Sequence, residues 1–211
     1  MTRILLARHG ETEWNALGRI QGWTESPLNE LGRTQAESLG TRLSAFPLAA
    51  IYSSDLSRAM DTAEAAAMRQ GLDVQPMPQL REKNFGRWEG LTAEDVARDY
   101  PDDWRRYHVM REWDASIPGG EAWADVQARI LAALNQVLAA HPAPEDTVLL
   151  VGHGGSLRLV ILEALNAALP TLLHLHLSNA SLSRLDFDSA HERSGRVLLL
   201  NDTSHLQGRD E

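Results

Sequence analysis

Apolar and polar positions follow two patterns that alternate along the chain. Short apolar runs predict buried strands at residues 3–7, 49–53, 74–77 and 147–151. Between these runs, apolar residues recur every three or four positions, which is the spacing of one face of a helix. Alternation of strands with longer helices favours an α/β fold whose sheet is mainly parallel.

Residues suited to helix ends agree with this pattern. A helix is expected from Asn29, a favoured N-cap residue, to about residue 45. A second helix is expected from about residue 56 to residue 70, because Gly71 is a favoured residue just past a helix end. The first of them should be a crossover helix between the first two strands.

The middle of the chain predicts three more helices. Thr92 is suited to cap a helix that runs through Asp99, and Pro101 to begin another that runs toward Glu112. The strongest amphipathic pattern covers residues 121–140.

The C-terminal part predicts an antiparallel edge of the sheet. Helices are expected over residues 156–165 and about 171–176, and alternating apolar positions predict strands over 182–187 and 197–200. The intervening residues 188–195 would close a hairpin between these two strands.

Length and composition predict one domain. The chain has 211 residues, 43% of them hydrophobic, and no linker-like stretch divides it. One core is therefore expected, in a domain spanning residues 1–211 with a helical insertion at about 84–123. The absence of cysteine excludes disulfides, thiolate ligands and a cysteine nucleophile. The apolar run before Arg8 is too short for a signal peptide or a membrane span, so we expect a soluble cytoplasmic protein without a membrane partner.

The charge balance limits the partners further. A formal net charge of -9 argues against a nucleic-acid partner and gives no general attraction for an anionic substrate. Any phosphate site must therefore be locally basic.

Arg8-His9-Gly10 directly follows the first predicted strand. A neutral imidazole is a competent nucleophile near neutral pH, and a guanidinium offers planar donors to phosphate oxygens. Gly10 would let the backbone approach a ligand closely. The motif thus indicates phosphoryl transfer through histidine.

Reactive side chains follow all four predicted parallel strands. They are His9, Arg58, Glu82 and His153. Ligands of open α/β sheets bind beyond the carboxyl ends of the strands, where these four would meet. Each residue alone has a purely structural explanation, but independent structural residues have no reason to share one rim.

The chain resembles the histidine phosphatase superfamily, in its phosphoglycerate-mutase-like branch. The resemblance covers nearly the whole length through six ordered segments: Leu6-Ala-Arg-His-Gly-Glu-Thr-Glu-Trp-Asn15, Arg19-Ile-Gln-Gly-Trp23, Pro27-Leu-Asn-Glu-Leu-Gly32, Ser53-Ser-Asp-Leu-Ser-Arg-Ala59, Leu80-Arg-Glu82 with Gly86-Arg-Trp-Glu-Gly90, and Val151-Gly-His-Gly154. It implies a three-layer α/β sandwich, with helices on both faces of a mainly parallel sheet that has an antiparallel edge.

The resemblance also implies the roles of individual residues. His9 is the nucleophile, and Glu82 is the general acid and base that protonates the leaving oxygen and then deprotonates water. Arg8, Arg58 and His153 bind the transferring phosphoryl group, whose charge is spread over its equatorial oxygens. No cofactor and no metal ion is implied.

Four further positions are expected to bind substrate by the same resemblance. They are Asn15, Gln21, Gly22 and Gly154. The partner implied is a small-molecule phosphate ester, and the motifs leave its alcohol unidentified because they recognise only the phosphoryl group. Oligomeric state stays open, and the resemblance is compatible with a homodimer.

The fate of phosphohistidine separates two activities of this family. Attack by water makes a phosphatase, and return to a phosphoglycerate makes a mutase that depends on 2,3-bisphosphoglycerate. Because the middle region is compact here and residues 86–90 look more like the phosphatase branch, we favour hydrolysis.

Aromatic residues gather between Asp99 and Trp123. They are Tyr100, Trp104, Tyr107, Trp113 and Trp123. This segment either forms a wall that recognises the alcohol portion of a substrate, or only packs the insertion onto the sheet.

Two other classes of function have some support in the sequence. His174-Leu-His176 suggests a metal-dependent hydrolase, but such spacing aligns two histidines only on a strand, and no carboxylate cluster completes a site. A catalytically silent protein that binds a phosphorylated ligand is the other alternative, and the presence of both His9 and Glu82 argues against it.

Overall fold

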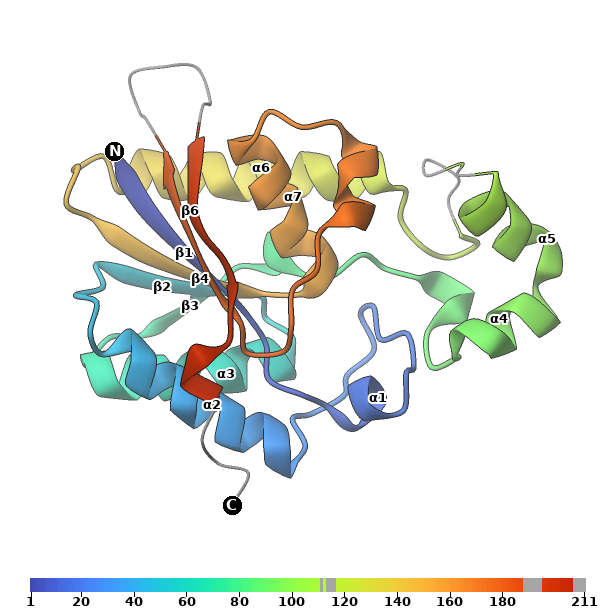
Figure 1. Cartoon of the computed structure of the whole chain (residues 1–211), viewed down its shortest axis with the longest axis horizontal. Coiled ribbons are helices and arrows are strands. Elements are labelled where there is room, and N and C mark those ends of the chain that lie inside the picture. Colours follow the sequence, from blue (N-terminus) through green and yellow to red (C-terminus); the bar gives the residue numbers. More distant parts are fainter. Residues whose placement is uncertain (111, 113–116, 188–194, 207–211) are drawn as a thin grey trace.

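One mixed sheet forms the centre of the molecule (Figure 1). The computed structural model describes residues 1–110, 112, 117–187 and 195–206. The strands lie in the order β3-β2-β4-β1-β5-β6. Their bounds are β1 Thr2–Arg8, β2 Ala50–Ser53, β3 Val74–Pro76, β4 Thr147–Gly152, β5 Leu182–Phe187 and β6 Gly195–Asp202.

The first four strands are parallel, and the last two form the antiparallel edge. β1 pairs in parallel with β4 and antiparallel with β5, and β5 pairs antiparallel with β6. The mainly parallel sheet and its antiparallel edge are thus confirmed. Of the turn predicted over residues 188–195, residues 188–194 lie outside the described residues, and Gly195 already belongs to β6.

Helices cover both faces of the sheet (Figure 1). On one face lie α2 and α3, and on the other α6 and α7, with α4 and α5 beside the sheet. The α-helices are α1 Glu13–Ala16, α2 Glu30–Leu43, α3 Ser57–Gln70, α4 Ala93–Asp99, α5 Pro101–Trp104, α6 Trp123–Ala140 and α7 Gly154–Ala164. The 3-10 helices are η1 Pro78–Leu80, η2 Gly86–Trp88, η4 Leu169–His174 and η5 Ser204–Leu206, and η3 Arg105–Val109 is a π-helix.

Side chains along each central strand alternate between two cores, because successive residues of a strand point to opposite faces of the sheet. On β1, Ile4 and Leu6 join the core beneath α6 and α7, whereas Leu5 and Ala7 join the core beneath α2 and α3. Burial on both faces explains why these strands are continuous apolar runs in the sequence.

Helix ends follow the local signals. The Asn29 side chain accepts a hydrogen bond from Gly32 N at the start of α2, and Gly71 ends α3 with a left-handed φ of 66°. Thr92 caps α4 through a reciprocal pair with Asp95. These three predictions are confirmed because each depends on contacts within one turn of chain.

Two predicted helices differ from the structure. The helix expected from Pro101 toward Glu112 is α5 followed by the π-helix η3, which ends at Val109. The helix expected over residues 171–176 is the 3-10 helix η4, which already ends at His174. Neither segment has a side-chain hydrogen bond at its N-cap that would favour a regular α-helix. In η3, ring contacts of Tyr107 and His108 with Trp88 hold the segment instead.

Among the described residues, no helix is both long enough and apolar enough to span a lipid bilayer.

Candidate active site

The strand register brings the two predicted histidines together. β1 and β4 pair in parallel with Arg8 beside Gly152, so the next residue on each strand is a histidine. His9 N donates to Gly152 O at 3.0 Å, and the rings of His9 and His153 lie 5.1 Å apart between centroids. Both side chains are buried.

Backbone geometry sets the tautomer of His9. Its Nδ1 lies 2.7 Å from Gly10 O, and a carbonyl oxygen can only accept. Nδ1 therefore carries the hydrogen, and Nε2 keeps the lone pair that a nucleophile needs. The Nε2 atom of His153 lies 2.8 Å from the hydroxyl of Ser54, at the end of β2.

Two arginines flank this pair of rings. Arg58 lies in the first turn of α3, is 0% exposed, and donates through Nη2 to Gly22 O at 2.7 Å and through Nη1 to Thr24 O at 3.1 Å. Arg8 donates through Nη1 to Leu177 O at 2.7 Å. The Nε atoms of both arginines are buried and have no hydrogen-bond partner among the described residues.

The electrostatics of the cluster favour an anionic ligand. Burial lowers the pKa of both histidines well below the ordinary value, and the neighbouring Arg8 and Arg58 guanidinium groups lower it further. Burial also lowers the pKa of Arg8 to about 10. Arg8 and Arg58 have Glu82 as an acidic neighbour, but with two guanidinium groups around one space the pocket still favours a bound anion.

The Glu82 carboxylate is held by two backbone N–H groups. Oε1 accepts from Lys83 N at 2.8 Å, and Oε2 accepts from Gly155 N at 2.7 Å near the start of α7. A Cβ atom at Gly155 would collide with Glu82 Oε1, so glycine at this position lets the carboxylate stay where it is. Glu82 therefore faces the histidine pair from the loop that follows η1.

All nine predicted site residues line one pocket of about 300 Å³. The structure thus brings these nine residues together, while their individual roles remain predictions. We call this space the phosphate pocket. Its other lining residues are Arg19, Ile20, Phe85, Gly155, Arg158, Leu175, His176 and Leu177.

The four residues predicted to bind substrate differ in their contacts. The Asn15 amide oxygen already accepts from Asn179 Nδ2 at 3.1 Å, which leaves its NH2 group for a ligand. Gly22 has a left-handed φ of 57°, and its carbonyl orients Arg58. Gly154 N lies at the N-terminus of α7, where an anion is favoured. Gln21 is buried with an unpartnered Oε1.

Gly10 is required for a reason that differs from the prediction. We expected it to admit close approach of a ligand, but a Cβ atom at Gly10 would collide with the Gly32 carbonyl of α2. Its N–H donates to Thr62 Oγ1 at 3.0 Å. Gly10 thus packs β1 against a helix, and it does not line the phosphate pocket.

Sequence reasoning did not assign three further side chains to the pocket, namely Arg158, Arg19 and His176. Arg158 donates through Nε to Gly154 O at 2.8 Å, one helical turn before it on α7. The spacing of four residues was the available signal, since residues i and i+4 of a helix are neighbours. Arg19 and His176 come from loops, where no spacing rule places them.

A second cavity of about 280 Å³ adjoins the phosphate pocket. The two share Ile20, Phe85 and Arg158 as lining residues. We call it the apolar chamber, and the rest of its lining is Trp88, Ala93, Trp104, Tyr107, His108, Trp123, Leu172 and Leu173.

The aromatic residues of the insertion both line this chamber and pack the core. Tyr107 and Trp123 are buried, and Trp123 Nε1 donates to the Tyr107 hydroxyl at 2.5 Å. Trp104 is partly buried and lies 3.8 Å from the His108 ring. Tyr100 lies under the Arg87 guanidinium, and Trp113 lies outside the described residues.

Within the described part of the chain, no group of three or more His, Cys, Asp or Glu side chains could hold a metal ion. His174 and His176 do not share one helix face, because η4 ends between them. His176 instead lines the phosphate pocket.

Comparison with known proteins gives one family. The family model of the histidine phosphatase superfamily (branch 1) matches residues 4–203. A probable phosphoglycerate mutase GpmB of Cronobacter sakazakii is 38% identical over 208 residues, covering 98% of this chain and 95% of the relative. Phosphoserine phosphatase 1 of Hydrogenobacter thermophilus is 35% identical over 206 residues, with the same coverage of 98% and 95%.

A solved structure has the same fold. The mycobacterial glucosyl-3-phosphoglycerate phosphatase in complex with VO3 superposes with a TM-score of 0.86 at 33% identity, covering 96% of this chain and 100% of that one.

Proposed function

The chain belongs to branch 1 of the histidine phosphatase superfamily, and on this premise we propose that it hydrolyses small phosphomonoesters through a phosphohistidine on His9. The observation that carries the proposal is the His9 tautomer: an Nε2 lone pair beside Arg8, Arg58 and His153 in one pocket. Phosphatase names among the relatives support hydrolysis.

The first step transfers the phosphoryl group. Nε2 of His9 forms a bond to phosphorus while the ester P–O bond breaks, and the leaving oxygen takes a proton from Glu82. The guanidinium groups of Arg8 and Arg58 balance the charge of the equatorial oxygens.

The second step releases phosphate. Glu82, now a carboxylate, takes a proton from a water molecule, whose oxygen bonds to phosphorus as the P–N bond breaks. His9 returns to its starting tautomer, which the Gly10 carbonyl fixes. No metal ion takes part in either step, so turnover should survive a chelator.

The test is to trap the intermediate. The protein is mixed with a ³²P-labelled ester, quenched in alkali and digested, and the label is mapped; we expect an alkali-stable phosphohistidine at position 9. His9→Ala should abolish labelling and turnover of p-nitrophenyl phosphate, vanadate should inhibit, and EDTA should have no effect. A label on another residue overturns the proposal, and binding without turnover of any ester indicates the silent binding protein instead.

A mutase activity is the second candidate because several relatives carry that name. The compact middle region does not separate this chain from GpmB, since the match covers 95% of that relative. Arg19 and Arg158 would give a phosphoglycerate carboxylate a cationic partner in the pocket. Incubation with 3-phosphoglycerate and 2,3-bisphosphoglycerate decides: we expect inorganic phosphate to form faster than 2-phosphoglycerate, and the reverse order establishes the mutase.

The apolar chamber supports esters whose alcohol carries an apolar group. It opens beside the phosphate pocket, and its lining is mostly aromatic and aliphatic. Burial of an apolar group contributes about 25 cal/mol per Å² of surface removed from water. A ring in this chamber would therefore bind more strongly than a sugar of similar size.

A further inference from the structure

We propose that Arg129 is a positioning residue for the general acid, holding the backbone around Glu82 from the side of α6. This inference rests on the proposed function, because it assigns Arg129 a role through Glu82. We call residues 79–84 the acid loop. Arg129 lies on the second turn of α6 and does not line the phosphate pocket.

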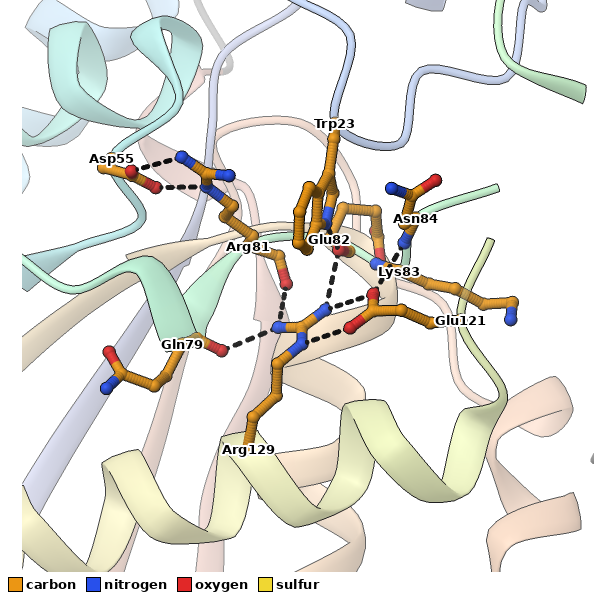
Figure 2. Close-up of polar contacts among 9 residues, drawn as sticks. All are labelled: Trp23, Asp55, Gln79, Arg81, Glu82, Lys83, Asn84, Glu121 and Arg129. Atoms are coloured by element: carbon orange, nitrogen blue, oxygen red, sulfur yellow. Dashed lines mark hydrogen bonds and ion pairs between the residues drawn. The ribbon is translucent and has the colours of Figure 1, made fainter. Parts of the chain in front are cut away.

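The Arg129 guanidinium uses all of its N–H donors on this loop and one carboxylate (Figure 2). Nη1 donates to Gln79 O and Arg81 O at 2.7 Å each, and Nη2 donates to Glu82 O at 2.8 Å. Nε and Nη2 donate to Glu121 at 2.8 and 2.9 Å. Carbonyls at 79, 81 and 82 therefore converge on a single side chain.

Hydrogen bonds hold Glu82, the predicted acid, both at its backbone carbonyl and at its side-chain carboxylate. Glu82 O accepts from Arg129 and also from Trp23 Nε1 at 2.7 Å, as Figure 2 shows. At the other end, Gly155 N holds the carboxylate. With the carbonyl and the carboxylate both fixed, the side chain between them has little freedom to leave the pocket.

Glu121 extends the same support to the end of the loop. Its Oε2 accepts from Asn84 N at 2.8 Å while the carboxylate pairs with Arg129 (Figure 2). Lys83, which lies between these contacts, is 0% exposed, and its Nζ lies 5.5 Å from the Trp123 ring. The backbone on both sides of Glu82 is thus tied to Arg129 of α6 and to Glu121, two residues before that helix.

The loop has few hydrogen bonds of its own to replace this support. The 3-10 helix η1 ends at Leu80, and residues 81–85 belong to no helix or strand. A planar guanidinium can reach three carbonyls at once, whereas an ammonium cannot reproduce that geometry. Misplacement of a catalytic group by about 1 Å can lower a rate about 100-fold.

The test uses two esters that differ in their need for an acid. p-Nitrophenyl phosphate releases a stable phenolate without prior protonation, and a simple alkyl phosphate requires a proton on its leaving oxygen. For Arg129→Met we expect kcat/KM on the alkyl ester to fall about 10- to 100-fold, and on the aryl ester about threefold or less. This ratio isolates the acid because kcat/KM covers only the steps through transfer to His9.

Rescue and a matched control separate positioning from general damage. Arg129→Lys should behave like Arg129→Met, and added guanidinium ion should restore alkyl-ester activity to Arg129→Ala. Arg33→Met is the control, since Arg33 also donates from a helix to a loop carbonyl, Leu28 O at 2.6 Å, and should change neither rate. If Arg129 variants do not fold, Glu121→Gln should show the same selective loss of kcat/KM on the alkyl ester, by a smaller factor.

The outcomes distinguish this inference from the function on which it rests. Equal loss on both esters for Arg129→Met and Glu121→Gln overturns the positioning role. Glu82→Gln should itself lose activity selectively on the alkyl ester, and combining it with Arg129→Met should add little. If Glu82→Gln affects both esters equally, the assignment of the acid fails instead.

Discussion

Gly155 lies so close to the predicted acid that any side chain there would force Glu82 to move. A methyl group would collide with Glu82 Oε1 and would lie 2.9 Å from the Trp123 ring. We therefore predict that Gly155→Ala displaces the carboxylate and lowers kcat/KM on an alkyl phosphate about 100-fold.

The neighbouring glycine is the matched control for this prediction. A Cβ atom at Gly154 would lie 3.7 Å from Arg8 Nε, an ordinary contact, and the backbone N–H would remain. Gly154→Ala should therefore cost far less activity than Gly155→Ala. A similar loss for both variants would show that the crowding of Glu82 is not the cause.

His153 gives a second prediction at the residue scale. Its pKa is lowered by burial and by Arg58, so without a ligand the ring is neutral at neutral pH. A bound oxyanion reverses the electrostatic balance and favours the imidazolium. We expect vanadate binding to take up about one proton near pH 7, measured by calorimetry in buffers of different ionisation enthalpy. His153→Gln should remove that uptake, and uptake that persists would assign the proton elsewhere.

At the scale of elements, the segment containing α4, α5 and η3 carries the aromatic wall of the apolar chamber. Trp104 is partly buried and contacts His108, so its removal enlarges the chamber without opening the main core. We predict that Trp104→Ala lowers kcat/KM for an aryl ester relative to a small polar ester about tenfold. Thermal unfolding measured in parallel checks the stability. An unchanged ranking of substrates contradicts a role in recognition.

Local signals in the sequence predicted the elements whose ends depend on neighbouring residues. Asn29 and Gly71 terminate helices through contacts within a few residues, and both ends are where the sequence indicated. The π-helix η3 has no such signal, because ring packing of Tyr107 and His108 against Trp88 holds that segment. The helix propensities of residues 105–109 cannot predict these contacts, because Trp88 lies outside the segment.

The site shows the same division between local and distant information. Residues at strand ends, such as His9 and His153, were predictable because the sheet brings the carboxyl ends of parallel strands together. Arg129 was not, since its partners in the acid loop lie 47 to 50 residues before it and are backbone carbonyls, which every residue possesses. Gly10 was selected, but for a contact with a ligand and not with Gly32.

At the scale of the whole molecule, burying neutral histidines makes stability depend on pH. The folded-state pKa values of His9 and His153 lie well below the ordinary value of 6.5. Below about pH 6.5 the unfolded chain therefore binds protons that the folded protein does not, and the unfolding free energy falls by about 1.4 kcal/mol per pH unit for each histidine. Above that range both states carry neutral rings and this contribution is constant.

We predict that denaturant unfolding between about pH 7.5 and pH 5.5 reveals this slope, before most carboxylates titrate. His108 and His205, whose pKa values burial also lowers, should add to it. The variant His153→Gln should have a shallower slope than the parent protein. Identical slopes for the two proteins would mean that His153 binds protons equally in the folded and unfolded states, so that burial does not lower its pKa.

The hydrogen bond from His9 Nδ1 to the carbonyl of Gly10 has a consequence for evolution. Many catalytic histidines are oriented by an acidic side chain, which a single nucleotide change can delete. Here the orienting atom is a main-chain carbonyl oxygen, which any residue at position 10 would also have. Drift in the surrounding sequence can therefore change the specificity of the proposed phosphatase while Nε2 of His9, its proposed nucleophile, keeps its lone pair.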